Sequence, residues 1–555
     1  MSGLDPAFVA LTSPGAPFAI GERDGMRQFL HAPADLNTMI ETARVHGGKT
    51  CIVEELDEGP DRRLTYDEVF AMRDRLVPLL GIKRGDRVAI CMRNRSEWIV
   101  GFLAVIKAGG IAALLNSRGS PAELTAMIGE VTPALVLADS QRAALIREGG
   151  YAGRMLDLTR PLDEAGAEAE AEAEAQIPGA AGPDDACVIL FTSGTTGRIK
   201  GAVLSHRNLI TGLMSVQLAG MQVLHTTAAR MGIPVETMLA NMPQQAVLLV
   251  YPLFHISGLG SALLSPFLAG SKIVVTRRWN ADRALRYIRD EQVTMFTGVP
   301  TMLWDVLNSA KLSDADLSSL RNIASGGQAL PVNLLEEMRA SCPQAMMGTG
   351  YGMTECSGAI AQAVGEDFVR KPSSAGRVLP LVEVRIAGPD GSELPLGEPG
   401  EIVVRGAQIM AGYWNRPDDT AAVLSPDGWL HTGDIGMLDE EGYVFIVDRK
   451  KDMVISSGEN IYCAEVERAL GEMPQIAECA AFGIPDDRLG ERLVCVVRAE
   501  GVSEADVTGW VAARLASYKA PTHVAFAAET LPRNHVGKVD KIALRRRWNE
   551  FYGVK

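Results

Sequence analysis

FTSGTTGRIKGAVLSHRN occupies residues 191–208. The apolar run 187–190 before it predicts a buried strand, residues 202–204 predict a second short strand, and the polar residues that follow open a helix. Glycines in the intervening loop let backbone N–H groups approach an anion, hydroxyl groups add donors, and Lys200 supplies a positive charge. The spacing differs from that of a Walker A loop, because Gly201 follows the lysine. We therefore predict a phosphate-binding loop rather than an exposed turn.

The loop pattern T-S-G-T-T-G-x-x-K-G resembles the phosphate-binding loop of the acyl-adenylate-forming (ANL) superfamily. That superfamily includes acyl-CoA synthetases, the adenylation domains of peptide synthetases, and firefly luciferase. The resemblance implies that this loop binds the phosphates of ATP, with Lys200 also taking part in catalysis. The implied ligands are Thr192, Ser193, Gly194, Thr195, Thr196, Gly197 and Lys200.

The composition argues against several classes of function. The 555 residues carry a formal charge of −14, so we expect no nucleic-acid partner, and any polyanionic ligand must meet local positive charge. None of the eight cysteines forms a C-x-x-C pair, which favours a reduced, cytoplasmic protein. Residues 1–17 lack the features of a secretory signal, and no apolar run is long enough to span a bilayer.

The order of the expected elements indicates an α/β fold. Strand 87–91, helix 96–107 and strand 111–115 form a βαβ pattern, which implies a parallel sheet. From about residue 372 onward, alternating strands and tight turns predict a small antiparallel, β-barrel-like unit. A charged run at 448–452 then precedes a compact α+β tail.

We place the domain boundary at this charged run. Residues 1–450 form the expected AMP-binding domain, and residues 451–555 form a small C-terminal domain. In relatives the small domain rotates between two half-reactions, which would make Lys451 the hinge. The alternating Ala/Glu tract at 163–176 is interpreted as a solvated linker or frayed helix without a catalytic role.

GYGMTE at residues 350–355 is the second motif. The aromatic face of Tyr351 can stack on a purine, Thr354 can bond a phosphate, and Glu355 can ligate Mg²⁺, which prefers oxygen ligands. A tyrosine between glycines is by itself more often part of a turn. The resemblance to the family motif Y-G-x-T-E implies the binding roles instead, with Thr354 and Glu355 also assigned to catalysis.

Two further motifs resemble family motifs and follow in the family order. TGD at 432–434 would place Asp434 against the ribose hydroxyls, with Arg449 as its partner. PRNHVGK at 532–538 would bring Lys538 into the site, where its ammonium offsets the repulsion between a carboxylate and the α-phosphate. Beyond the phosphate loop, the resemblance assigns to ATP or AMP the residues Gly327, Gln328, Ala329, Gly350, Tyr351, Gly352, Met353, Thr354, Asp434, Ile446, Arg449 and Lys538.

The resemblance covers nearly the whole chain and implies two half-reactions. A carboxylic acid and MgATP give an acyl-adenylate and pyrophosphate, and a nucleophile then displaces AMP. Ser457 and Gly458 would line the path of a pantetheine arm, where glycine leaves room. His255 occupies the position at which amino-acid-activating domains carry an aspartate, which argues against an α-amino acid substrate. The residues expected around the acyl group are His255, Ser257, Gly326, Thr349, Gly350, Met353 and Cys356. His255 is also assigned to catalysis, where it would orient the carboxylate.

The favoured function is an ATP-dependent carboxylic acid:CoA ligase with ATP, Mg²⁺ and coenzyme A as cofactor and co-substrates. Small residues around the expected acyl site allow a medium- or long-chain fatty acid, or a bulky aryl or alicyclic acid. Thr349 replaces the glutamine common in plant hydroxycinnamate ligases, which puts that substrate in doubt. A stand-alone acyl-AMP ligase that loads a carrier protein and a non-catalytic ligand-binding relative are the alternatives, and a homodimer is a family-level expectation.

Overall fold

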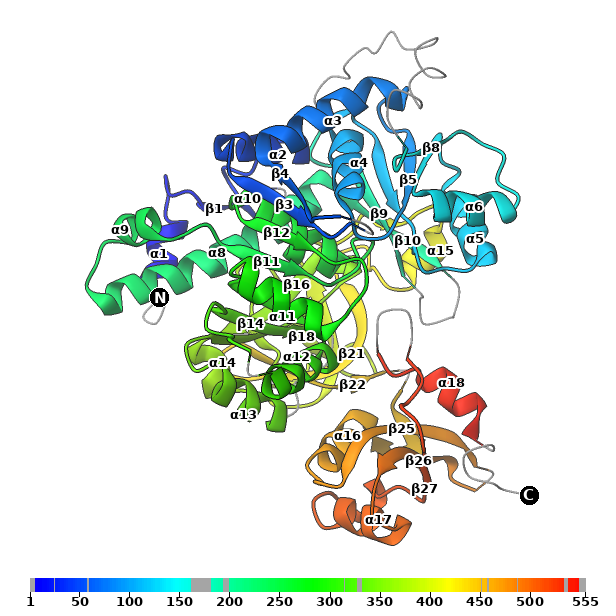
Figure 1. Ribbon diagram of the computed structural model, residues 1–555. Coiled ribbons are helices and arrows are strands. Elements are labelled where there is room, and N and C mark those ends of the chain that lie inside the picture. Colours follow the sequence, from blue (N-terminus) through cyan, green and yellow to red (C-terminus); the bar gives the residue numbers. More distant parts are fainter. Residues whose placement is uncertain are drawn as a thin grey trace.

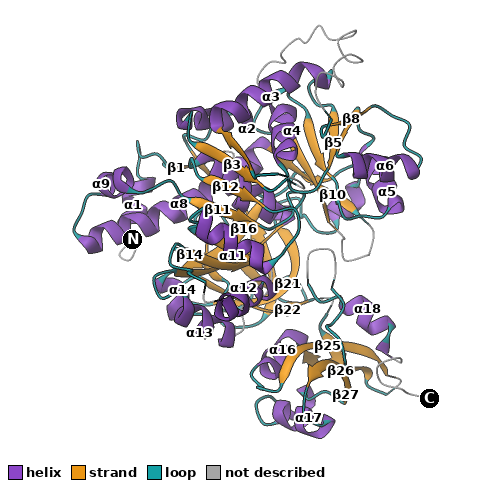
Figure 2. Ribbon diagram, in the orientation of Figure 1, coloured by secondary structure: helices purple, strands orange, loops and turns teal. Residues whose placement is uncertain are grey.

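The computed structural model describes residues 5–23, 25–56, 59–160, 181–192, 199–313, 315–326, 332–450, 452–456, 459–486, 488–533 and 538–548. Two large sheets lie in the upper part of Figure 1, and a smaller sheet near the C-terminus lies apart from them. Figure 2 shows helices lying over the strands of both large sheets. The α/β fold class expected from the sequence is confirmed.

The first large sheet has seven strands within the described ranges. Its centre is parallel, because β5 pairs in parallel with β6 and β7, and β6 pairs in parallel with β9. Helices connect β5 to β6 and β6 to β7, as the βαβ pattern predicts. In spatial order the strands are β20 (Gly412–Tyr413), β10 (Lys200–Ser205), β9 (Ala186–Thr192), β6 (Ile111–Leu114), β5 (Arg87–Cys91), β7 (Leu135–Ala138) and β8 (Met155–Asp157). The carboxyl ends of β5, β6, β7 and β9 therefore meet at one edge, where the phosphate loop leaves β9.

The second large sheet has thirteen strands in the described part of the chain. Strands β11 to β15 pair in parallel, and the strands from β16 to β22 pair antiparallel. In spatial order they are β18 (Glu383–Ala387), β19 (Gly400–Arg405), β21 (Leu430–Leu438), β22 (Tyr443–Arg449), β17 (Gly376–Val378), β16 (Gly358–Val364), β15 (Met346–Met353), β14 (Asn322–Gly326), β13 (Met295–Gly298), β11 (Ala246–Leu249), β12 (Lys272–Val275), β3 (Thr50–Glu54) and β4 (Arg62–Thr65).

The expected antiparallel strands after residue 372 are present, and they are hydrogen-bonded to the parallel strands of the large sheet through β16 and β15. The short strand β17 pairs with β16 on one side and with β22 on the other. This pairing satisfies the backbone groups of both neighbours, so β18, β19, β21 and β22 continue the large sheet.

Residues 454–526 build the third sheet, which has five strands in the described ranges. Long antiparallel partners β25 and β26 form its centre, and β27 pairs in parallel with β26. Its strands are β23 (Val454–Ser456), β24 (Glu459–Ile461), β25 (Ile476–Asp486), β26 (Gly490–Ala499) and β27 (His523–Phe526). A separate two-stranded hairpin, β1 (Ile20–Arg23) and β2 (Met26–Phe29), lies near the N-terminus.

Helices connect and cover the strands. In the N-terminal half they are α1 (Pro6–Thr12), α2 (Leu36–Glu41), α3 (Tyr66–Leu80), α4 (Ser96–Lys107), α5 (Pro121–Val131), α6 (Ser140–Glu148), α8 (His206–Met231) and α9 (Val235–Asn241). In the remainder they are α10 (Ser265–Leu268), α11 (Ala281–Asp290), α12 (Pro300–Ser313), α13 (Val332–Ser341), α14 (Glu366–Arg370), α15 (Pro417–Ala421), α16 (Cys463–Gly471), α17 (Glu504–Ala512) and α18 (Lys541–Arg546).

The helix that follows the phosphate loop, α8, is 26 residues long. It begins with a capping box, because Ser205 Oγ accepts from the Asn208 N–H at 3.2 Å and Asn208 Oδ1 accepts from the Ser205 N–H at 2.9 Å. It ends at Gly232, whose φ of +68° places it in the left-handed region. In Figure 1 the second half of α8 projects from the molecule together with α9.

All eight cysteines are free thiols. Seven are buried and Cys479 is half-buried. Burial raises the pKa of each thiol above its ordinary value, to about 11 for Cys342 and to about 12 for Cys91.

None of the helices in the described ranges combines the length and the apolar character needed to cross a membrane.

Candidate functional site

Tyr351, Asp434 and Arg449 meet at the centre of the candidate site. Tyr351 lies on β15, and Asp434 and Arg449 are register partners on the antiparallel strands β21 and β22. The Tyr351 hydroxyl donates to Asp434 Oδ2 at 2.8 Å, and Arg449 Nε lies 2.8 Å from Asp434 Oδ1. Asp434 is only 3% exposed. A carboxylate held from both sides is a fixed acceptor, which suits recognition of sugar hydroxyls.

The turn before Asp434 is held by several hydrogen bonds. The Asp434 N–H donates to Thr432 Oγ1 at 3.1 Å, and the Thr432 hydroxyl donates to the Ile402 carbonyl at 2.7 Å. The N–H of Gly433, a residue with φ of +71°, donates to Glu401 Oε1 at 3.2 Å. Local backbone geometry therefore fixes the position of the Asp434 carboxylate.

Lys538 reaches this centre from the C-terminal part of the chain. The pKa of its ammonium is lowered, first by burial and then by Arg449, whereas Asp434 acts in the opposite direction. Both side chains are therefore within electrostatic reach of Lys538. The structure thus brings together four residues from separate motifs, Tyr351, Asp434, Arg449 and Lys538.

Thr354 and Glu355 follow β15 in a single 3₁₀ turn and are both buried. The Tyr413 hydroxyl donates to Glu355 Oε1 at 2.9 Å. Burial raises the pKa of Glu355, and the nearby Asp434 raises it further. A desolvated carboxylate on the cavity wall beside a second carboxylate fits a cation that is shared with phosphate oxygens, as Mg²⁺ commonly is.

Lys200 and Thr192 flank the phosphate loop. Lys200 Nζ lies 2.5 Å from Asp419 Oδ1 and 5.3 Å from the centre of the Tyr413 ring. The buried Thr192 hydroxyl has no hydrogen-bond partner in the part of the chain that the structure describes. Asp419, which lies in none of the predicted motifs, is the partner of Lys200 here, so a bound phosphate would share or displace that contact.

Some predicted site residues lie outside the described ranges. They are Ser193, Gly194, Thr195, Thr196, Gly197, Gly327, Gln328, Ala329, Lys451, Ser457 and Gly458. Their expected roles stay predictions.

A cavity of about 3400 Å³ contains the site. The lining residues that the sequence predicted are Thr192, Lys200, His255, Ser257, Gly326, Thr349, Gly350, Tyr351, Gly352, Met353, Thr354, Glu355, Asp434, Ile446, Arg449 and Lys538.

Position 258 requires glycine, because a Cβ there would lie 2.1 Å from the Pro252 carbonyl oxygen. This close approach fixes the turn that carries His255.

Cys356 does not lie where the acyl site was expected. Its side chain is fully buried in the hydrophobic core rather than on the cavity wall. The reason is the 3₁₀ turn Thr354–Cys356, which turns the chain away from the direction of β15 after Met353. Cys356, although it is a small residue next to a binding motif, therefore belongs to the hydrophobic core.

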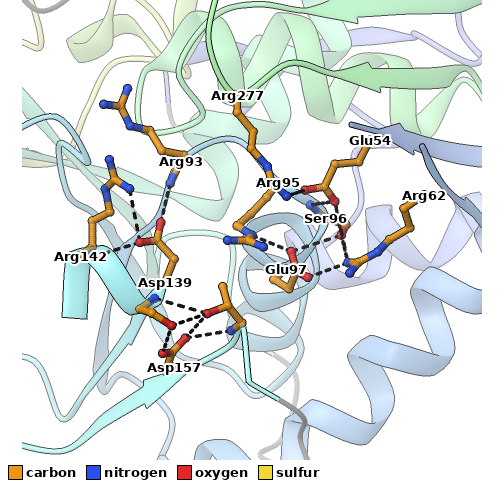
Figure 3. A network of polar contacts seen from close by, with 12 residues as sticks. Glu54, Arg62, Arg93, Arg95, Ser96, Glu97, Asp139, Arg142, Asp157 and Arg277 are labelled. Carbon is orange, nitrogen blue, oxygen red and sulfur yellow. Dashed lines mark hydrogen bonds and ion pairs between the residues drawn. The ribbon is translucent and has the colours of Figure 1, made fainter. Parts of the chain in front are cut away.

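Three arginines gather at the carboxyl edge of the seven-stranded sheet, and a fourth, Arg278, which follows β12 of the other large sheet, acts on them. Arg93 follows β5, Arg118 follows β6, and Arg142 lies on α6 beside Asp139; Figure 3 shows Asp139 between Arg142 and the backbone of Arg93. The pKa of Arg93 is lowered to about 10, first by burial and then by Arg142, Arg118 and Arg278, with Asp139 opposing.

This arginine cluster shares the sheet edge from which the phosphate loop leaves β9, and such edges are common ligand sites in α/β proteins. Sequence reasoning missed it. The available signal was an arginine within two to four residues of the end of each of two strands in an otherwise acidic chain.

Asp448 joins the end of β22 to α16. Asp448 Oδ1 accepts from the Arg449 N–H at 2.7 Å, and Oδ2 accepts from the Ala464 N–H at 3.2 Å in the first turn of α16. Lys541, which is paired with Glu467 at 2.8 Å, also faces Asp448. Burial outweighs the attraction of Lys541 and raises the pKa of Asp448 to about 6.

Asp448→Asn is expected to change the pH dependence of stability. Because the folded-state pKa is raised, the wild type gains stability as pH falls through about 6, whereas the asparagine of the variant cannot titrate. Between pH 7.5 and pH 5 the free energy of unfolding of the wild type should rise by about 1 kcal/mol relative to the variant. Urea unfolding of both proteins at several pH values measures this difference, and parallel curves would contradict it.

Comparisons with known proteins agree with the geometry. A family profile described as AMP-binding enzyme matches residues 39–414, and one described as AMP-binding enzyme C-terminal domain matches residues 465–538. The chain is 36% identical to a feruloyl-CoA synthase of Amycolatopsis sp., with 87% of this chain and 94% of the relative covered. It is 31% identical to a long-chain-fatty-acid–CoA ligase of Mycobacterium tuberculosis, with 89% and 95% covered.

Two solved structures of o-succinylbenzoate CoA synthetase from Bacillus subtilis have the same fold. The complex with the acyl-adenylate intermediate matches with a TM-score of 0.76 at 30% identity, covering 94% of this chain and 98% of that one. The complex with ATP and magnesium ion matches with a TM-score of 0.75 at 31% identity, covering 92% and 98%.

Proposed function

The chain belongs to the family of AMP-binding enzymes and is an AMP-forming acid–thiol ligase, and from this premise we propose that it joins a medium- or long-chain fatty acid, or a bulky hydrophobic acid, to coenzyme A. The observation that carries the proposal is the meeting of Lys538 with Asp434 and Arg449. This arrangement of charged side chains supports formation of the acyl-adenylate, which is the first half-reaction.

In the first half-reaction a carboxylate oxygen attacks the α-phosphorus of ATP and pyrophosphate leaves. Asp434 would hold the ribose, and the ammonium of Lys538 would offset the repulsion between the two anions. Mg²⁺, held by Glu355 and the phosphates, would supply additional positive charge when bound. The acyl-adenylate carries a good leaving group, so a thiol can then displace AMP and form the thioester.

The second half-reaction needs a different arrangement of the C-terminal part. We assign residues 1–450 and 451–555 to two domains with a hinge at Lys451. The separate five-stranded sheet that starts at Val454, directly after β22 ends at Arg449, supports this division. In the rotated arrangement Ser457 and Gly458 would face the pantetheine arm, and Lys538 would leave the site.

The arginine cluster favours coenzyme A over a carrier protein as the acceptor. The nucleotide of coenzyme A carries several phosphate charges, which a protein of net charge −14 can bind only where basic residues gather. Arg93, Arg118, Arg142 and Arg278 supply such a place, and one carboxylate, Asp139, acts on Arg93 within it.

AMP release from MgATP over a panel of carboxylic acids, with and without coenzyme A, tests the proposal. We expect release to require both a hydrophobic acid and coenzyme A, with the thioester detected by mass spectrometry. Pantetheine, which lacks the nucleotide, is the matched control and should need a much higher concentration. Pyrophosphate exchange that does not respond to coenzyme A would contradict the proposed acceptor and point to a carrier protein.

A further inference from the structure

Asp419 contacts Lys200 from outside the cavity. Lys200 lines the cavity, whereas Asp419 does not, so the carboxylate reaches the ammonium from behind the cavity wall. Asp419 lies on α15, a helix of five residues, and Figure 1 shows α15 beside β10, the strand that begins at Lys200. Lys200 Nζ and Asp419 Oδ1 lie 2.5 Å apart. A phosphate group in the cavity would approach the same ammonium from the opposite side.

Lys200 is the more buried partner of this ion pair. Its side chain is 9% exposed, whereas the side chain of Asp419 is 33% exposed. An ammonium so far removed from water needs a negative partner, because its loss of hydration is otherwise uncompensated. Asp419 supplies one such partner, and a phosphate group would supply another. Since Asp419 is partly exposed, water can solvate its carboxylate when a phosphate takes the lysine.

The segment from β20 to α15 holds Asp419 near Lys200. The Tyr413 N–H donates to Thr420 Oγ1 at 2.9 Å, which ties the first turn of α15 back to β20. Arg416, directly before α15, donates to both carboxylate oxygens of Glu130 on α5, at 2.8 and 2.7 Å. The helix that carries Asp419 is therefore fixed at both a backbone and a side-chain contact.

The same segment also contacts the predicted magnesium ligand. Lys200 Nζ lies 5.3 Å from the centre of the Tyr413 ring, and the Tyr413 hydroxyl donates to Glu355 Oε1 at 2.9 Å. Thr192 is the register partner of Lys200, and its buried hydroxyl lacks a hydrogen-bond partner within the described ranges. An ammonium and a hydroxyl side by side on the cavity wall suit an anionic oxygen, so Asp419 is placed to compete with that oxygen.

We propose that Asp419 competes with the phosphate groups of the substrate for Lys200, and that its return to Lys200 speeds the release of pyrophosphate. Because two anions share one ammonium, each lowers the affinity of the site for the other. Asp419 therefore acts through Lys200 as a positioning residue and does not itself touch the nucleotide. This inference rests on the proposed function, in which Lys200 binds phosphate and pyrophosphate is the first product.

Asp419→Asn tests the inference, because asparagine keeps the shape of the side chain and removes its charge. We expect the full-length variant to bind magnesium pyrophosphate about 5-fold to 30-fold more tightly than the wild type in isothermal titration calorimetry. The dissociation rate, measured by stopped-flow displacement with excess tripolyphosphate, should fall by a similar factor. Asp418→Asn is the matched control, since Asp418 is the exposed neighbour on the same helix and its loss should change the affinity less than about 2-fold.

The sign of the change separates competition from structural support. If Asp419 only stabilised the fold around Lys200, its loss would weaken pyrophosphate binding, whereas competition predicts stronger binding, which a misfolded variant cannot give. Asp419→Glu keeps the charge and should bind magnesium pyrophosphate within about 3-fold of the wild type. In a Lys200→Ala background the shared ammonium is absent, so adding Asp419→Asn should change the affinity less than about 2-fold.

Three results would overturn the inference and leave a CoA ligase in place. They are unchanged or weaker pyrophosphate binding in Asp419→Asn, tighter binding without slower release, and a full gain in affinity that persists in the Lys200→Ala background. A wild type that neither binds magnesium pyrophosphate nor catalyses pyrophosphate exchange with any acid would instead overturn the proposed function. The two failures are therefore distinguishable.

Discussion

Lys538→Ala is expected to lower the rate of acyl-adenylate formation by about 10²–10³. The ammonium of Lys538 lies where Asp434 and Arg449 act on its pKa, at the centre of the nucleotide site. Attack of a carboxylate on ATP brings two anions together, and no other lysine among the predicted site residues in the described ranges reaches Asp434. Pyrophosphate exchange with the preferred acid measures this loss directly.

The same variant should retain the second half-reaction. A synthetic acyl-adenylate with coenzyme A should give thioester at nearly the wild-type rate, because Lys538 is expected to leave the site in that step. Lys311→Ala is the control, since Lys311 on α12 forms an ion pair with Glu337 on α13 and does not line the cavity. Loss of both half-reactions would refute the assignment.

Because burial lowers the pKa of Lys538, the rate of adenylation by the wild type should also decline with rising pH at a pH below the ordinary pKa of lysine.

Asp434→Ala is expected to lower kcat/KM for ATP by a factor of about 30 or more. Asp434 is buried and accepts from Tyr351 and Arg449, so its removal leaves Arg449 and Lys538 beside each other without the carboxylate between them. The ribose would also lose its acceptor. The ATP dependence of pyrophosphate exchange measures the effect.

Asp434→Asn separates the two contributions. Asparagine keeps an acceptor for the Tyr351 hydroxyl but removes the charge that faces Arg449 and Lys538. We expect an intermediate loss and an earlier decline of the rate with rising pH, because Asp434 raises the pKa of Lys538. An unchanged ATP dependence in both variants would exclude Asp434 from nucleotide binding.

Much of the fold follows from local sequence patterns. The spacing of Trp98, Phe102 and Val105 predicts the helix that the structure shows as α4 (Ser96–Lys107), and the apolar runs on either side of the phosphate loop predict β9 and β10. The continuation of the large sheet past β16 could not be predicted. It depends on β17, a strand of only three residues that pairs on both edges, and so short a segment has no recognisable pattern.

The sequence predicted those site residues that lie in recognisable motifs. Asp434 and Arg449 could be placed together, but only the fold shows that they are cross-strand partners and that Tyr351 donates to the same carboxylate. Asp419 was missed because nothing near Lys200 in the sequence points to α15.

The buried cysteine thiols make it practical to label the protein at introduced cysteines. Because seven cysteines are buried and burial raises their pKa values, we expect the native chain to react poorly with maleimide dyes. A pair of new cysteines, at exposed Glu148 on α6 and exposed Arg514 after α17, can then carry a donor and an acceptor fluorophore without deleting native residues. Energy transfer between them would follow the distance between the two parts of the enzyme in single molecules, one catalytic cycle at a time.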